Sequence, residues 1–125
     1  EFAHSGDLLR LPRGVLVYAV EGPFYFGAVE NFERALATTH TDPRVLIVRL
    51  RRVPFIDGTA LQTLEEVIAG LHKRGVRVML TGANVRVQAK LERAGIIDLV
   101  GRANSFSELP QALAAGKPET PLQSE

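Results

Sequence analysis

The stretch Val53-Pro54-Phe55-Ile56-Asp57-Gly58-Thr59-Ala60-Leu61-Gln62-Thr63-Leu64 decides the fold of this chain. An apolar strand runs into a turn that contains an acid and a glycine, and an amphipathic helix leaves that turn. Thr59 and Gln62 have the spacing of a capping box, in which each side chain bonds the backbone amide of the other residue. The stretch therefore predicts a strand, a turn and a helix in succession, and it marks the turn as the candidate functional surface.

The overall composition is that of one compact domain. The chain has 125 residues, of which 46% are hydrophobic, and 15 basic side chains stand against 14 acidic ones. This balance provides no global field for a nucleic-acid partner, and the absence of cysteine excludes disulfides and thiolate metal sites. The apolar run Val15–Val20 covers 6 residues, whereas a membrane-spanning helix needs roughly twenty. We therefore expect this fragment to be soluble.

Strands and helices are predicted to alternate along the chain, beginning with a hairpin of Asp7–Leu11 and Val15–Val20 around Pro12-Arg13-Gly14. A helix is expected around Val29–Leu36, then a strand at 45–48, the helix after the turn, a strand at 76–80, a helix capped by Asn84 with Val87, Leu91 and Ala94 inward, a short strand at Ile96–Val100 and a helix capped by Ser107. This order predicts an α/β fold: a small, mostly parallel sheet with an N-terminal β-hairpin edge and about four helices.

Three loops follow predicted strands at their carboxyl ends, at 21–27, 52–59 and 81–84. Ligands and partners of open parallel sheets are met at that end, so we expect these loops to form one surface. Its candidate partner-binding or regulatory residues are Tyr25, Asp57, Gly58, Thr59, Gly82 and Asn84.

Asp57 has two interpretations. A negative charge before a helix is favourable by roughly 0.3 to 1 kcal/mol and orders the loop. An exposed carboxylate at a strand end is also suited to contact a partner. The phosphoacceptor aspartate of a receiver domain would sit similarly, but that function needs an acidic pair after the first strand, and Glu21 stands alone there.

Aromatic and basic residues flank the same turn. We expect Phe24 and Phe26 to pack in the core and Tyr25 to be the interface anchor of the three. Arg51 and Arg52, in the basic run 49–52, are candidate contacts for an anion such as anionic lipid, a nucleotide phosphate or an acidic carrier protein. The alternative is that these arginines are ordinary solvated surface residues with no ligand, because clusters of surface charge are common.

Enzymatic constellations are missing from the sequence. His4, His40 and His72 have neither metal-ligand spacing nor a neighbouring nucleophile. No glycine-rich phosphate-binding motif follows a strand, so only a weak nucleotide contact through helix N-termini remains. We expect no catalytic residue, no metal and no cofactor.

The segments 20–27 and 53–61, followed by Lys73-Arg74-Gly75-Val76 and Leu91-Glu92-Arg93-Ala94-Gly95-Ile96, resemble the STAS domain at the C-terminus of bacterial SulP anion transporters. The resemblance implies a non-catalytic regulatory and interaction domain on the cytoplasmic face of the inner membrane. Its implied partners are the transmembrane transport domain of the same full-length chain and a cytoplasmic protein. The full-length transporter would form a homodimer and carry sulfate, bicarbonate or small carboxylates.

The alternative is a free-standing STAS switch protein of the anti-sigma factor antagonist type. Those proteins carry a phosphorylated serine directly after the motif aspartate, where this chain has Gly58, so that switch does not carry over. The resemblance covers residues 14–115. We expect residues 1–13 to comprise a leader, typical of a cloning junction or a cut in a longer protein, and the first strand, and residues 116–125 to form a disordered tail.

Overall fold

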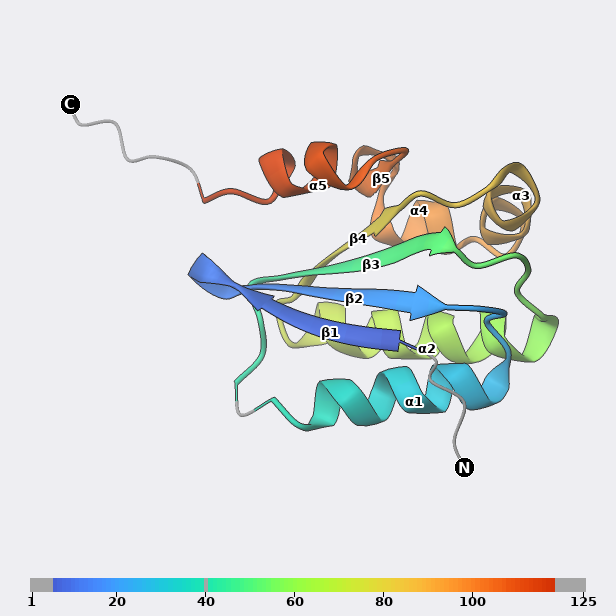
Figure 1. The fold of residues 1–125 in the computed structure, drawn as a ribbon, viewed down its shortest axis with the longest axis horizontal. Helices are drawn as coiled ribbons and strands as arrows, with labels where there is room; N and C mark the ends of the chain where they lie inside the picture. The colour runs from blue at the N-terminus through green and yellow to red at the C-terminus, as the bar shows by residue number, and fades with distance from the viewer. Residues whose placement is uncertain (1–5, 40, 119–125) are drawn as a thin grey trace.

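A computed structural model describes residues 6–39 and 41–118 of the chain, and within them one five-stranded sheet lies at the centre (Figure 1). The strand order is β1-β2-β3-β4-β5. β1 is antiparallel to β2, and the other neighbours are parallel, so the predicted α/β class with its antiparallel hairpin edge is confirmed. The strands are β1 (Gly6–Leu11), β2 (Val15–Glu21), β3 (Val45–Arg52), β4 (Arg77–Thr81) and β5 (Ser105–Phe106).

Helices cover the two faces of the sheet unequally. Figure 1 shows α1 (Phe26–Ala37) and α2 (Gly58–Lys73) side by side beneath the strands, with α5 (Leu109–Ala115) on the other side. α3 (Val85–Arg93) and α4 (Ile96–Val100) add buried side chains to the same large core as α1 and α2. The smaller core under α5 consists of Val17, Val45, Ile47, Met79 and Ala112. Two 3-10 turns, Pro12–Gly14 and Arg102–Asn104, complete the described elements.

The segment Ile96–Val100 is a helix, and its prediction as a strand is wrong. Ile96, Ile97 and Val100 are all buried in one core, which is the spacing of one helix face, whereas a strand would send Ile96 and Ile97 to opposite sides. Short apolar runs of this kind do not distinguish the two structures by periodicity. The chain consequently has five α-helices in its described part, one more than expected.

Two further details around the last helices differ from expectation. Ala94 is exposed, because α3 ends at Arg93 and only Val87 and Leu91 of this helix reach the core. α5 begins after Glu108 and not after Ser107. The side-chain oxygen of Gln111 accepts from the backbone amide of Glu108 at 3.1 Å, which fixes the first turn one residue later than predicted.

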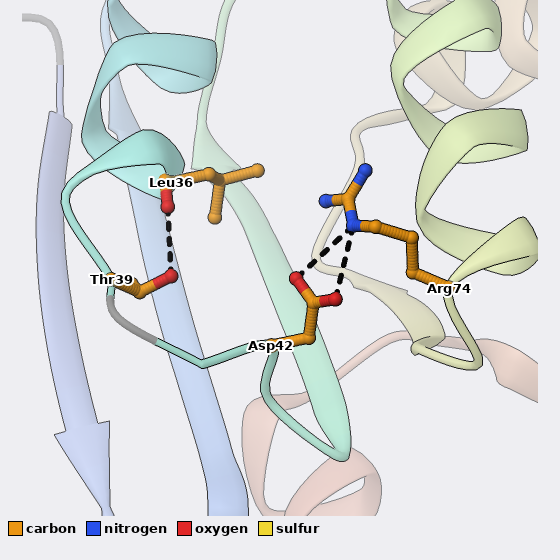
Figure 2. Close-up of polar contacts among 4 residues, drawn as sticks. All are labelled: Leu36, Thr39, Asp42 and Arg74. Carbon is orange, nitrogen blue, oxygen red and sulfur yellow. Dashed lines mark hydrogen bonds and ion pairs between the residues drawn. The ribbon is translucent and has the colours of Figure 1, made fainter.

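An ion pair joins two loops at the amino ends of β3 and β4, opposite the candidate surface (Figure 2). Arg74 Nε lies 3.1 and 3.0 Å from the two carboxylate oxygens of Asp42. Nearby, the Thr39 hydroxyl donates to the Leu36 carbonyl at 2.8 Å. The side chains of Arg74 and Asp42 are 53% and 40% exposed, so solvent screens the pair and it contributes little stability.

Candidate interaction surface

The loops that follow β2 and β3 are joined by their backbones. The Phe24 amide donates to the Phe55 carbonyl at 2.9 Å, and the Asp57 amide donates to the Phe24 carbonyl at 3.3 Å. Phe24 and Ile56 form an isolated parallel bridge between these bonds. The loops therefore continue the sheet beyond the regular strands, and they carry Tyr25 and Asp57 to the same end of the molecule.

Asn84 ties the third loop, between β4 and α3, to the loop after β3. Its side-chain oxygen accepts from the Val87 amide at 2.8 Å, which confirms the predicted cap of α3. Its side-chain nitrogen donates to the carbonyl of Val53 at 3.2 Å. Lys90, one turn further along α3, donates to the Ile56 carbonyl at 3.1 Å. α3 therefore holds the turn before α2 in place.

Asp57, not Thr59, caps α2. The carboxylate accepts from the Ala60 amide at 2.8 Å, and Asp57 has the extended backbone of a cap residue. Thr59 already lies within the helix and is exposed, so its prediction as the cap is wrong. The capping-box spacing gave the wrong cap because Asp57, two residues earlier, also provides an acceptor for a free backbone amide in the first turn. Asp57 thus has a structural role in the described conformation, and Thr59 is an exposed residue of the first turn.

The two glycines of the candidate set differ in what they require. Gly58 is exposed, its φ is not positive, and a Cβ added there would meet no atom within 4 Å. Gly82 has φ +78°, and an added Cβ would lie 3.2 Å from the Cα of Arg51. Only Gly82 is demanded by the backbone, because L residues rarely adopt that conformation. Gly58 is a free position at the start of α2.

Aromatic side chains at this end are more exposed than expected. Phe24 is fully buried and packs edge to face on Phe32 at 6.4 Å between ring centroids, as predicted for a core residue. Phe26 is 44% exposed, so its assignment to the core is wrong: it begins α1 and stands with Tyr25, also 44% exposed, outside the sheet. Strand alternation does not extend into the first turn of a helix.

Two exposed apolar residues of this surface were not predicted from the sequence. Phe55 is 49% exposed in the loop after β3, and Val85 is 87% exposed at the first position of α3. The exposure of Val85 could have been predicted from its position directly after the cap Asn84, because the first turn of a helix often faces solvent. The exposure of Phe55 could not, because the neighbouring Val53 and Ile56 are buried and the loop has no periodic pattern.

The candidate anion-contact arginines lie at the end of β3, and Arg52 forms a loose ion pair with Glu21 at 3.9 Å. Arg51 is exposed. Across residues 6–39 and 41–118, no group of three or more potential ligands is placed to hold a metal ion.

None of the described helices is both long and apolar enough to cross a membrane.

The STAS domain family model matches residues 9–112. The structure of a SulP transporter STAS domain from Vibrio cholerae is 51% identical, with a TM-score of 0.76 over 85% of this chain and 83% of that one. A sulfate transporter family protein from Wolinella succinogenes is 36% identical, with a TM-score of 0.78 over 86% of this chain and 88% of that one.

The chain matches only part of its curated relatives. It is 28% identical over 110 residues to Mycobacterium tuberculosis Rv1739c, described as a probable sulfate transporter, covering 85% of this chain and 20% of that protein. An anti-sigma factor antagonist-type structure from Thermotoga maritima, at 14% identity, shares the fold alone. The transporter comparisons therefore fit the motifs better than the switch-protein alternative. The chain belongs to the STAS domain family and, within it, to the STAS domains of SulP transporters.

Proposed function

We propose that this chain is the non-catalytic, cytoplasmic regulatory domain of a SulP-type secondary anion transporter that carries sulfate, bicarbonate or small carboxylates. Its main partner is the transmembrane transport domain of the same full-length chain, in a homodimer on the inner membrane. The 51% identity to a SulP transporter STAS domain carries this proposal. The anti-sigma antagonist alternative loses support at Gly58, which has no hydroxyl for the phosphorylation that such switches use.

The docking surface that we infer is the aromatic end of the sheet, defined by Tyr25, Phe26 and Phe55. These rings are 44 to 49% exposed although all three lie on loops or helix starts held by backbone bonds. Aromatic side chains that stand in water on a rigid support are favoured anchors of protein interfaces. The Asp57 carboxylate is engaged in capping α2, so the rings and not this acid supply the contact.

The test is anion uptake by the full-length transporter in reconstituted vesicles. Tyr25→Ala and Phe55→Ala should change uptake, because each removes an exposed ring while leaving the buried core intact. Leu9→Ala is the matched control, since Leu9 is 57% exposed on the edge strand β1. Melting curves of the isolated variants should match the parent domain. Unchanged uptake in both ring variants, with normal folding, would remove the docking function from this end of the sheet.

A further inference from the structure

On the face of the sheet that carries α5, a row of residues lies beyond the small core at the carboxyl ends of the strands. Strand pairing aligns Ala19 of β2 with Arg49 of β3, Arg49 with Thr81 of β4, and Thr81 with Phe106 of β5. Strand alternation puts Arg49 and Thr81 on the side of Ile47 and Met79, which belong to the α5 core. This row is therefore the carboxyl-end continuation of the α5 face, on the opposite side from α1 and α2.

Two arginines at the end of the central strand have no partners. The register of β2 and β3 shifts after Ala19, and the side chains of Arg49 and Arg51 line one hollow at this point. Neither guanidinium has a hydrogen bond or an ion pair within residues 6–39 and 41–118. Arg52 lines the same hollow and is paired with Glu21 at 3.9 Å. The basic run therefore separates into one paired arginine and two free ones.

Thr81 adds an unsatisfied donor to the same face. The residue is 1% exposed, and its hydroxyl has no hydrogen-bond partner. Buried hydroxyls are nearly always bonded, so this one calls for an acceptor. Its two strand neighbours supply none, because the guanidinium of Arg49 only donates and Phe106 has an apolar side chain. The hydroxyl is covered by its neighbours, and Arg49 is the residue paired with Thr81 across β3 and β4.

The two free arginines border a small hollow at the end of β3. The hollow is lined by Ala19, Val20, Glu21, Arg49, Arg51 and Arg52. Ala19 contributes only a short side chain to this lining. The negative charge of Glu21 is offset by Arg52 at 3.9 Å. The two free guanidinium groups therefore dominate the charge around the hollow.

We propose that Arg49, Arg51 and Thr81 form a binding site for a small oxyanion, such as sulfate, phosphate or the phosphate of a lipid headgroup. Guanidinium groups bind such oxygens through paired, charge-assisted hydrogen bonds, and two arginines on one strand converge on one anion. The anion also gives the Thr81 hydroxyl the acceptor that it lacks. The site lies on the α5 face of the sheet, and its binding does not depend on the aromatic docking surface.

The 125-residue chain is titrated with sodium sulfate and sodium phosphate, against chloride at matched ionic strength, while NMR follows the amides of Ala19, Thr81 and Gly82. Saturable shifts at these amides are expected. Arg49→Gln and Arg51→Gln should each weaken binding about tenfold or more, because a charged hydrogen-bonding partner is lost. Thr81→Val, which keeps the side-chain shape, should weaken it about threefold or more.

Arg93→Gln is the matched control, because Arg93 is an exposed arginine on α3 with no bonded partner among the described residues. A second arm measures binding to phosphatidylcholine vesicles with and without phosphatidylglycerol. Binding of free anions that Arg49→Gln and Arg51→Gln abolish would assign the site to a soluble anion; loss of vesicle binding alone would assign it to a lipid phosphate. If Arg49→Gln and Arg51→Gln behave like Arg93→Gln in both arms, the proposal is overturned. Equal affinity of the Thr81→Val variant and the parent chain for the anion would contradict the inclusion of Thr81 in the site.

Discussion

Replacing Asn84 by alanine tests whether one side chain holds both α3 and the turn before α2. The variant loses the cap on Val87, which costs about 0.5 to 2 kcal/mol, and the bond to the Val53 carbonyl, which costs about 0.5 to 1.5 kcal/mol. If the two losses add, the free energy of unfolding falls by about 1 to 3.5 kcal/mol. Urea denaturation of the isolated chain, followed by circular dichroism, measures this quantity.

Asn84→Asp separates the two contributions. An aspartate caps a helix as well as asparagine does, so the bond to Val87 is kept. The carboxylate has no hydrogen to donate to the carbonyl of Val53 or, at 3.4 Å, to that of Pro54, so the bonds of the side-chain nitrogen are lost and the cap is kept. We therefore expect Asn84→Asp to fall between the parent and Asn84→Ala. The reasoning is refuted if Asn84→Ala unfolds within about 0.5 kcal/mol of the parent, the range of an ordinary surface change, or if the aspartate variant is the less stable of the two.

Three other substitutions test the local assignments by the same measurement. Asp57→Ala should cost about 0.5 to 2 kcal/mol as a lost cap, whereas Thr59→Ala should stay within about 0.5 kcal/mol; the reverse order would restore Thr59 as the cap. Asp42→Asn should cost at most about 1 kcal/mol, less in high salt, because its ion pair is exposed. Gly82→Ala should cost about 1 to 2 kcal/mol from its left-handed backbone alone, with more from the contact with Arg51, and a neutral result would contradict the close approach of the two strands.

Local chemistry determined much of the fold from the sequence alone. The hairpin follows from Pro12 and Gly14 between two apolar strands, and the structure has β1 and β2 there. Asn84 caps α3, and Gly75 and Gly95 have the positive φ expected of residues that end helices. These features depend on a few neighbouring residues, so a single sequence carries enough information to predict them.

Predictions from local sequence were wrong where the same residues are compatible with two different conformations. Ile96–Val100 is apolar enough for a strand, but packing against the large core selects a helix. Asp57 and Thr59 are both good cap residues, and the backbone of the turn decides between them. Phe26 and Phe55 could each have been buried, and their exposure depends on where the joined loops point.

The candidate site shows the same division most clearly. The sequence predicts that the loops after the strands share one end of the sheet, because parallel strands have that property in common. It does not place Thr81 beside Arg49, since those residues are 32 positions apart in the chain and meet only through the register of β3 and β4. Register and side-chain burial are set by the packing of all elements at once, so only the tertiary structure brings the free arginines and the unpaired hydroxyl together.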